Sequence, residues 1–190
     1  MQDFLIRSAR EGDIPAMLAV YAPYVERTAV SFEYAVPSEA EFRERLHRVQ
    51  AFYPWLVAEH EGRVLGYAYA SRFHPRAAYD WCAEASIYLE QGARGQGIGR
   101  RLYTALEQAL RGQNILTSYA CIAWAEQPDE YLGHHSIRFH ERMGYRTVGQ
   151  FPSCGFKFGR WYGMVWMEKR LAPEGTAPVP VIPYGMGEDG

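Results

Sequence analysis

The stretch Arg94-Gly95-Gln96-Gly97-Ile98-Gly99-Arg100 joins two segments of different periodicity. Residues 83–89 before it alternate in character and predict a strand, whereas apolar residues at helical spacing from 102 to 110 predict a helix. The glycines allow a sharp turn and leave its N–H groups uncovered by side chains. Unpaired N–H groups at the positive end of a helix bind anions. We therefore predict a cradle for a phosphate or pyrophosphate, with Arg94, Arg100 and Arg101 adding charge beside it.

The glycine spacing departs from two common nucleotide-binding loops. A Walker loop ends in Gly-Lys-Ser/Thr, but the matching residues here are Gly99-Arg100-Arg101. A dinucleotide fingerprint needs G-x-G-x-x-G, but these glycines follow G-x-G-x-G. An ordinary glycine-rich turn is the remaining alternative. The pattern Arg-x-x-Gly-x-Gly over residues 94–99 resembles the acetyl-coenzyme A pyrophosphate loop of the GNAT acyltransferases. This resemblance implies that residues 94–100 bind acetyl-CoA as a co-substrate.

Length and composition fit one domain with a substantial core. The chain has 190 residues, of which 48% are hydrophobic and 15% aromatic. A net charge of −2 gives no electrostatic reason to expect a nucleic-acid partner. No apolar run reaches membrane-spanning length and the N-terminus has no secretion-signal pattern, so no membrane partner is expected. Cys82, Cys121 and Cys154 lack zinc-like spacing, which predicts reduced thiols in a cytoplasmic protein and no metal site.

Hydrophobic periodicity predicts an alternating order of strands and helices. Strands are expected at residues 4–9, 55–60, 63–71, 83–89, 115–123, 145–150 and 156–169, with a short β-prone segment at 29–32. Helices are expected at residues 14–26, 38–49, 135–143 and after the cradle. Local signals set several boundaries: Asp13 as a helix N-cap, Ser38 with Glu41 as a capping box, Glu61-Gly62 as a hairpin turn, and Gly144 as a helix C-cap.

Five further motifs narrow the resemblance to the phosphinothricin N-acetyltransferase branch of GNAT. They lie at residues 53–57, 76–81, 84–88, 136–145 and 155–161, and the likeness covers residues 4–171. It implies a GNAT acyl-CoA N-acyltransferase fold of the mixed α/β (α+β) class over residues 1–171. The central sheet would be mostly antiparallel, flanked by helices on both faces and splayed where the coenzyme inserts. The resemblance also implies a homodimer and a small-molecule amine substrate.

Glu84 is the first candidate catalytic residue. Acetyl transfer from a thioester needs a neutral amine, so a general base must accept the proton of the ammonium, directly or through water. Glu84 lies on the strand that leads to the cradle, in an otherwise apolar and aromatic segment. The matching glutamate is the proposed base of the resembling family. The alternative is a carboxylate that is exposed or paired with an arginine such as Arg72 or Arg76.

His140 is the second candidate. The resemblance places it where many GNAT enzymes carry a tyrosine that protonates the leaving sulfur, and imidazole can donate or accept a proton near neutral pH. A packed or surface histidine is the alternative. The resemblance further implies that the strand Ile87-Tyr88-Leu89 pairs with the pantetheine arm. One N–H group, from Tyr88 or a neighbour, would bond the thioester oxygen. Ser136, at the start of the last helix, is assigned to the coenzyme site in the same way.

Candidate substrate-binding residues are Arg76, Tyr79, Lys157 and Phe32. Arginine binds planar oxyanions through two hydrogen bonds, tyrosine can donate to them, and a small amino acid carries a carboxylate. The alternatives are a surface ion pair for Arg76 and solvated strand polarity for Lys157. Phe32 and Glu33 correspond to a region that lines the acceptor cleft in the resembling family.

The chain departs from the family pattern near the last helix. The family carries an asparagine that contacts the coenzyme where this chain has Gly133, and residues 126–132 form a longer, acidic loop. The natural acceptor is therefore expected to be an amino acid or amine that need not be phosphinothricin. The alternatives are acetylation of a peptide or protein, a non-enzymatic coenzyme A sensor and a plain nucleotide-binding module, the last opposed by the missing Lys-Ser/Thr.

The last residues, 172–190, change character. They contain four prolines, four glycines and three acidic residues but no lysine or arginine, which predicts a flexible tail. The apolar run at residues 179–184 offers the alternative of docking on the body of the protein or on a partner subunit.

Overall fold

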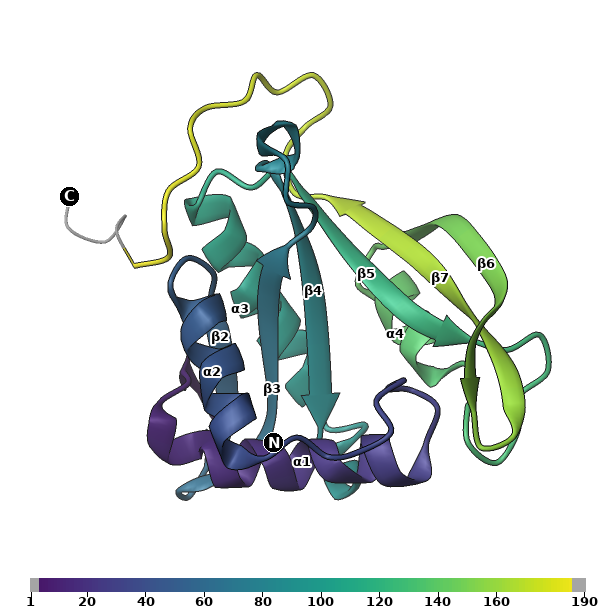
Figure 1. The fold of residues 1–190 in the computed structure, drawn as a ribbon. Coiled ribbons are helices and arrows are strands. Elements are labelled where there is room, and N and C mark those ends of the chain that lie inside the picture. The colour runs from purple at the N-terminus through teal and green to yellow at the C-terminus, as the bar shows by residue number, and fades with distance from the viewer. Residues whose placement is uncertain (1–3, 186–190) are drawn as a thin grey trace.

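Seven strands and four helices alternate along residues 4–185, the part of the chain that the computed structural model describes (Figure 1). The strands are β1 (Leu5–Ser8), β2 (Trp55–His60), β3 (Arg63–Arg72), β4 (Cys82–Leu89), β5 (Thr117–Trp124), β6 (Arg146–Lys157) and β7 (Arg160–Arg170). The helices are α1 (Ile14–Arg27), α2 (Glu39–Gln50), α3 (Ile98–Gly112) and α4 (His135–Arg142).

All seven strands form one sheet in the order β1-β2-β3-β4-β5-β7-β6. Neighbouring strands are antiparallel except β4 and β5, which are parallel. The predicted fold class, a mixed α/β domain with a mostly antiparallel sheet, is therefore confirmed. The parallel pair is made possible by α3, which carries the chain from one end of β4 back to the start of β5.

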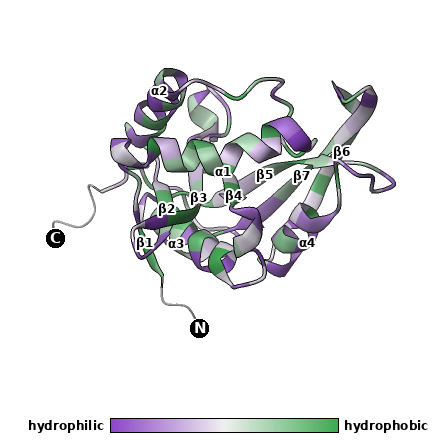
Figure 2. Ribbon diagram, turned by 90° about the horizontal axis from the view of Figure 1, so that it is seen from below, coloured by the Kyte–Doolittle hydropathy of each residue, from purple (hydrophilic) through white to green (hydrophobic). Residues whose placement is uncertain are grey.

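Helices cover both faces of the sheet, as predicted (Figure 2). On one face, α1 and α2 bury Met17, Phe42 and Leu46 against β2 and β3. On the other face, α3 buries Leu102 and Leu106, and the apolar side of α4 packs against the same cluster. The two faces thus enclose separate apolar cores, and the sheet between them is the frame that positions the site.

Most of the boundary signals read from the sequence are confirmed. The Ser38 side chain accepts from the Glu41 N–H while the Glu41 carboxylate accepts from Ser38, which is the predicted capping box. Glu61 and Gly62 have positive φ values of 50° and 78°, as a tight hairpin turn between β2 and β3 requires. Gly144, with φ 89°, follows the end of α4 in the left-handed conformation of a helix C-cap.

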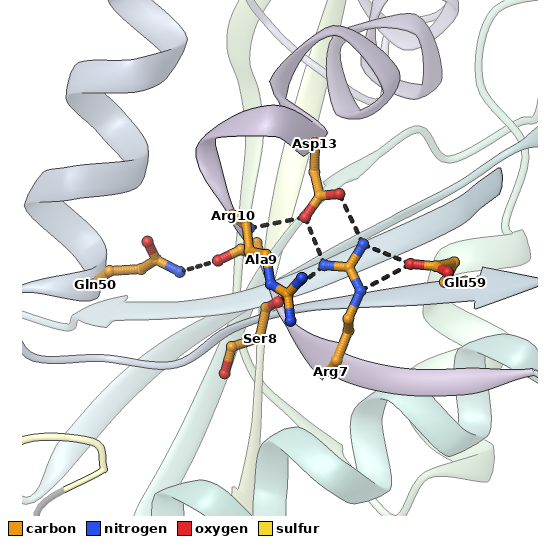
Figure 3. Close-up of polar contacts among 7 residues, drawn as sticks. All are labelled: Arg7, Ser8, Ala9, Arg10, Asp13, Gln50 and Glu59. Atoms are coloured by element: carbon orange, nitrogen blue, oxygen red, sulfur yellow. Dashed lines mark hydrogen bonds and ion pairs between the residues drawn. The ribbon is translucent and has the colours of Figure 1, made fainter. Parts of the chain in front are cut away.

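Asp13 is the N-cap residue of α1, as predicted, but its side chain makes no hydrogen bond to the helix N-terminus (Figure 3). Instead it accepts two hydrogen bonds from the Arg7 guanidinium, at 2.7 and 2.8 Å, and one from the N–H of Arg10. Arg7 also pairs with Glu59 of β2 at 2.6 Å. The Arg7 guanidinium holds the pKa of Asp13 below its usual value, so this carboxylate ties the start of α1 to β1 and β2.

Two strand predictions also need correction. Residues 29–32 form no strand and instead belong to the loop between α1 and α2. The expected strand at 156–169 is divided by a turn at Phe158-Gly159, where both residues have positive φ, and Lys157 pairs with Arg160 across it. A bulky residue seldom adopts positive φ, which is why the sequence did not indicate this hairpin. As a result β6 and β7 form a long ribbon.

The segment at residues 179–184 lies against the body of the protein. The N–H groups of Ile182 and Tyr184 donate to the carbonyl oxygens of Gln113 and Phe52, at 3.2 and 2.9 Å. Asn114 donates to the Pro180 carbonyl, and Val181 and Tyr184 pack on the α3 core. The prediction of a flexible tail is therefore wrong for these residues, and the docking alternative holds for them. Within residues 4–185, no helix is long and apolar enough to cross a membrane.

Candidate active site

The sheet opens between β4 and β5 (Figure 1). The two strands pair only at residues 82–84 with 117–119, although β4 continues to Leu89 and β5 continues to Trp124. Beyond Glu84 the strands diverge, so that one edge of β4 has no strand partner over residues 85–89. This is the splay that the sequence predicted for the place where the coenzyme inserts.

Backbone direction alternates along β4 and decides which groups face the opening. Thr117 donates to the carbonyl of Trp81 on the β5 side, whereas Glu90, just after β4, donates to a β3 carbonyl 2.9 Å away. Successive residues of a strand present their N–H and C=O groups to opposite edges. The backbone groups of the odd-numbered residues of β4 therefore point toward β5. The N–H of Ile87 therefore faces the opening, and that of Tyr88 faces β3. The sequence predicted that Tyr88 or a neighbour donates to the thioester oxygen. Of Ile87 and Tyr88, Ile87 is the one whose N–H group faces the opening.

The last residue of β4 already has a partner on its open edge. The Tyr24 hydroxyl of α1 donates to the Leu89 carbonyl at 2.6 Å and accepts from the Leu89 N–H at 3.2 Å. Arg94 donates to the same hydroxyl at 3.0 Å. Leu89 and Arg94, both predicted coenzyme residues, are thus joined by Tyr24, which the sequence did not single out. Within residues 85–89 the backbone groups left for a bound chain on the open edge are the carbonyl of Ala85 and both groups of Ile87, since the N–H of Ala85 belongs to the last rung of the β4–β5 ladder.

The glycine loop predicted to form an anion cradle lies at the N-terminus of α3. Gly95 and Gly97 have φ values of 79° and 83°, and Gly97 is the residue that precedes the helix. No side chain caps this helix, so its first N–H groups lack partners within the helix. Arg100 is exposed beside them, and Gln96 is exposed in the loop. Ile98 is buried in the core, so only its backbone can serve the cradle.

The three arginines of the cradle, Arg94, Arg100 and Arg101, are all exposed. Arg94 donates to the Tyr24 hydroxyl, whereas Arg101 donates to the Phe4 carbonyl at 2.9 Å and lies over the Phe4 ring. Gly99 is buried, and a Cβ there would come within 3.2 Å of Leu89 and Phe139 side-chain atoms. Glycine at this position therefore lets α3 approach β4 and α4 closely.

Two cavities meet at the opening of the sheet. A larger one, of about 400 Å³, lies on the α1–α2 face, and a smaller one, of about 50 Å³, lies between β4, β5 and α4. Ser86, Tyr88, Cys121 and Ala123 line both of them, so the cavities adjoin at the opening. The walls of the larger cavity are mainly aromatic: Tyr21, Phe42, Trp55, Tyr67, Tyr69 and Tyr88.

Glu84 lines the larger cavity at the point where β4 and β5 separate. Within residues 4–185 it has no hydrogen bond or ion pair, and Arg72, which was considered as a partner, pairs with Asp80 at 3.1 Å. Burial raises the pKa of Glu84 above its ordinary value of 4.5. An unpaired, partly buried carboxylate with a raised pKa has the properties of a general base.

His140 lies in α4 and lines the smaller cavity together with Ser136 and Tyr103. Its Nδ1 is 2.8 Å from the Ser136 carbonyl, which can only accept, so Nδ1 carries the proton. Nε2 then accepts from the Tyr103 hydroxyl at 2.8 Å. Burial lowers the pKa of His140 to about 4, so the ring is neutral at pH 7. The Tyr103 hydroxyl, missed in the sequence, thus donates its proton to His140, and burial raises the pKa of this hydroxyl well above its ordinary value of 10.

The buried His140 makes stability depend on pH. In the unfolded chain it binds a proton near pH 6.5, but in the folded protein only near pH 4. Protonation between these values favours unfolding, so stability from this residue is lost as the pH falls, by roughly 3 kcal/mol in all. We expect urea unfolding to show a steeper loss from pH 7 to pH 4 in the wild type than in His140→Gln. A control, His47→Gln at an exposed site on α2, keeps the wild-type slope. Equal slopes in wild type and His140→Gln contradict the expectation.

Lys157, predicted to bind substrate, is buried in a structural role. Its Nζ donates to the carbonyl oxygens of Val25, Thr28 and Ser31, at 2.7, 3.0 and 2.6 Å. All three ammonium protons therefore have partners, and burial lowers the pKa of the group. The solvated alternative is wrong as well, because only 3% of the residue is exposed. Lys157 binds the C-terminus of α1 and fixes the loop that carries Ser31, Phe32 and Glu33 to the cavity.

Replacing Lys157 with methionine is expected to lower stability and to loosen this loop. The substitution removes three charge-assisted hydrogen bonds and leaves three carbonyl oxygens without a donor, at an expected cost of about 3 kcal/mol. The KM for the acceptor rises with it, because the loop forms one wall of the cavity. Lys169→Met is the control, since Lys169 binds Glu107 of α3 at 2.7 Å, away from the cavity. Urea unfolding measures the stability of each variant, and acceptor titration measures its KM for the acceptor. An unchanged acceptor KM in Lys157→Met contradicts the expected role of the loop.

The other predicted substrate-binding residues lie in two different places. Phe32 lines the large cavity, as predicted. Arg76 and Tyr79 do not line it; both are exposed on the segment between β3 and β4, where Tyr79 contacts the rings of Phe73 and His74. Within this chain they are separate from the cavity, and their role in binding stays a prediction.

The loop before α4 is held in place rather than loose. Asp129 accepts from the N–H groups of Tyr131 and Leu132, both at 2.8 Å, and from Tyr162 and Arg160 of β7. The Tyr131 carbonyl in turn accepts from the Ala29 N–H at 3.0 Å. The loop thus supports the segment that borders the large cavity, and its own buried Leu132 lines the smaller one.

Of the other charged residues in the large cavity, Glu33 was expected from the family resemblance and Arg45 was not found from the sequence. Arg45 of α2 and Glu33 of the loop before it both line the cavity and pair at 2.6 Å. Helical spacing places Arg45 beside Phe42, but nothing in the sequence indicates that it meets Glu33. Residues 4–185 contain no group of three or more His, Cys, Asp or Glu arranged to hold a metal ion.

Comparison with known proteins gives one consistent result. Residues 6–166 match the family model described as an acetyltransferase (GNAT) domain. A phosphinothricin N-acetyltransferase of Alcaligenes faecalis is 37% identical over 175 residues, which cover 91% of this chain and 86% of that protein. An L-methionine sulfoximine/L-methionine sulfone acetyltransferase of Pseudomonas paraeruginosa is 34% identical over 176 residues, covering 91% of this chain and 98% of that protein.

A solved structure with a similar fold contains acetyl-CoA. The crystal structure of a GNAT superfamily phosphinothricin acetyltransferase from Sinorhizobium meliloti, in complex with acetyl-CoA, superposes with a TM-score of 0.85. The two sequences are 32% identical, and the match covers 96% of each chain.

Proposed function

The chain belongs to the GNAT acetyltransferase family, and we propose that it transfers the acetyl group of acetyl-CoA to the amine of a small molecule. The proposed acceptor is an amino acid or an analogue such as phosphinothricin, methionine sulfoximine or methionine sulfone. Relatives named for these substrates support the proposal. The observation that carries it is the position of Glu84, on the wall of the acceptor-sized cavity beside the opening between β4 and β5.

The residues present fit acetyl-CoA at two places. The uncapped N-terminus of α3, with the exposed Arg100 beside it, suits the pyrophosphate. The open edge of β4 offers the carbonyl of Ala85 and the backbone of Ile87 to the pantetheine arm. We place the thioester in the opening between β4 and β5, with the N–H of Ile87 directed at its oxygen. Such a donor stabilises the negative charge that develops during acyl transfer.

The proposed chemistry uses both cavities. The acceptor enters the larger cavity, and Glu84 takes a proton from its ammonium, directly or through water. The neutral nitrogen then attacks the thioester carbon, so that a C–N bond forms and the C–S bond breaks. The second amine proton passes through water to the thiolate, which leaves as the thiol, and Glu84 then releases the first proton to solvent. His140 and Tyr103, hydrogen-bonded to each other, line the smaller cavity on the β5–α4 side of the opening.

Compartment and assembly form a further part of the proposal. We place the protein in the cytoplasm, which three cysteines without disulfide bonds support. We also propose a homodimer, because the ribbon of β6 and β7 exposes Val148, Phe151, Phe156 and Trp161 together with the neighbouring Tyr34. Apolar patches of this kind commonly mark contacts between subunits.

Thiol release from acetyl-CoA against a panel of amines tests the proposed activity. The panel contains phosphinothricin, methionine sulfoximine, methionine sulfone, the standard amino acids, polyamines and short peptides. Turnover on amino acids or their analogues supports the proposal, and activity confined to peptides moves the chain to protein modification. Silence on every amine, with acetyl-CoA binding intact, favours the coenzyme sensor and contradicts the proposed enzyme.

A further inference from the structure

Arg45 is the only basic residue that lines the large cavity within residues 4–185. The two basic residues that the sequence offered for this task lie elsewhere. The Lys157 ammonium donates to three backbone carbonyl oxygens, and Arg76 is exposed outside the cavity. An acceptor bound beside Glu84 therefore meets one guanidinium and no other cation from residues 4–185.

The geometry of Arg45 leaves part of its guanidinium available. Its Nη1 donates to the Glu33 carboxylate at 2.6 Å, and its Nε and Nη2 have no hydrogen-bond partner within residues 4–185. Arginine pairs with a carboxylate or phosphinate through two parallel N–H···O bonds, which these two nitrogens can supply. Glu33 thus anchors the side chain without using the donors that a bidentate oxyanion needs.

The anchor is itself held by buried contacts. The Glu33 N–H donates to the Ser31 hydroxyl at 3.2 Å, and that hydroxyl is 2.7 Å from the Tyr21 hydroxyl. Lys157 fixes the same loop through the Ser31 carbonyl. Arg45 therefore extends from a helix to a loop that is fixed at several points, so its guanidinium is oriented before an acceptor arrives.

The charges of the cavity match a zwitterion. Glu84 provides a base for an ammonium group, and Arg45 provides a cation for an oxyanion, in one cavity of about 400 Å³. The remaining walls combine aromatic rings with the neutral hydroxyl groups of tyrosine and serine side chains, and Glu33, their other charged residue, is paired with Arg45. In such surroundings a charge pair is stronger than in water, because the effective dielectric constant is lower.

From this arrangement we propose that Arg45 recognises the oxyanion of the acceptor and makes the enzyme selective for amines that carry a carboxylate or phosphinate. The inference rests on the proposed acetyltransferase activity and names the part of the acceptor that this chain recognises. Arg45 determines specificity, and Glu33 positions it. Because Glu33 keeps Nη1, oxyanion binding does not require the Glu33–Arg45 pair to break.

Four acceptors separate the two oxyanions: methionine sulfone, the same amine without its carboxylate, phosphinothricin, and the aminoalkyl phosphinate without the carboxylate. The variant Arg45→Gln is expected to lower kcat/KM about 10- to 100-fold for acceptors with the recognised oxyanion. The sulfone amine without any oxyanion changes less than about twofold, since it makes no charge-assisted bond to lose. The proposal is supported if kcat/KM falls for every acceptor that carries the carboxylate, or for every acceptor that carries the phosphinate. The pattern identifies which oxyanion Arg45 binds.

Two further variants distinguish recognition from a general disturbance. Arg45→Lys keeps the charge but loses the fork, and we expect it to restore part of the activity on oxyanion acceptors. Arg43→Gln, on the same helix and paired with exposed Glu11 at 3.5 Å, is the control and behaves as the wild type. An equal penalty on all four acceptors, or no penalty on any oxyanion acceptor, overturns the proposal.

Failure of the enzyme activity itself gives a different result. In that case the wild type releases no thiol with any of the four acceptors, which contradicts the proposed function. Isothermal titration of methionine sulfone and phosphinothricin into wild type and Arg45→Gln then tests the site by binding alone. Binding by the wild type that weakens about 10-fold or more in the variant supports recognition by Arg45. No binding to the wild type, or equal affinities, overturns it.

Discussion

Glu84→Gln is expected to lower the turnover number about 10²- to 10⁴-fold while leaving acetyl-CoA affinity nearly unchanged. The amide has the same shape as the carboxylate but cannot accept the proton of the ammonium. Within residues 4–185 no hydrogen bond or ion pair to Glu84 is lost in the exchange, so the fold has little reason to respond. The effect is therefore specific to the chemical step.

The pH dependence of turnover gives a second readout for Glu84. Burial raises the pKa of this carboxyl group above 4.5, and only its ionised form can act as the base. Turnover of the wild type should therefore rise with pH through the raised pKa, and the variant should lose this component. Stopped-flow or steady-state thiol release between pH 5 and pH 9 measures it. Glu141→Gln, at an exposed position of α4, is the control. Wild-type turnover in Glu84→Gln would remove Glu84 from the mechanism.

Gly97→Val is expected to weaken acetyl-CoA binding about 100-fold. Gly97 has a φ of 83° at the start of α3, a conformation that a β-branched residue adopts only under strain. The strained loop can relax only by moving the N–H groups that we assign to the pyrophosphate. The chain has open space at this position, so the loss reflects the backbone conformation and not a clash within the folded protein.

Isothermal titration with acetyl-CoA measures this loss, and thermal unfolding shows whether the fold survives. Gly92→Val is the matched control, because Gly92 lies in the preceding turn, also has open space around it, and does not have a positive φ. We expect the control to bind with nearly wild-type affinity. Equal affinities in both variants contradict the assignment of the α3 N-terminus to the coenzyme.

The fold was predictable because its signals are local. The glycine loop between an alternating segment and an amphipathic one indicated β4, the cradle and α3, and the capping box at Ser38 indicated the start of α2. The turn at Phe158-Gly159 was missed because phenylalanine rarely adopts positive φ. The docking of residues 179–184 was indicated only as an alternative, since their partners, just after α3 and α2, are distant in sequence.

The site was predictable only in part, because several of its contacts join residues that are distant in sequence. Glu84, His140 and Phe32 lie beside the two cavities, in positions that short motifs indicated. Lys157 was misread because its three carbonyl partners lie more than 120 residues earlier in the chain, and only the folded sheet brings them together. Arg45 was missed because its importance comes from the cavity that it faces and not from its neighbours in sequence.

The structure of a complex with coenzyme A and methionine sulfone tests the central claim most directly, because this pair lacks the acetyl group and cannot react. We predict the thiol in the opening between β4 and β5, with the pyrophosphate at the N-terminus of α3. The amine of methionine sulfone should lie within hydrogen-bond reach of Glu84, directly or through one water, and on the α1–α2 face of the sheet. A thiol outside this opening, or an amine bound away from Glu84, would contradict acetyl transfer through the sheet at this point.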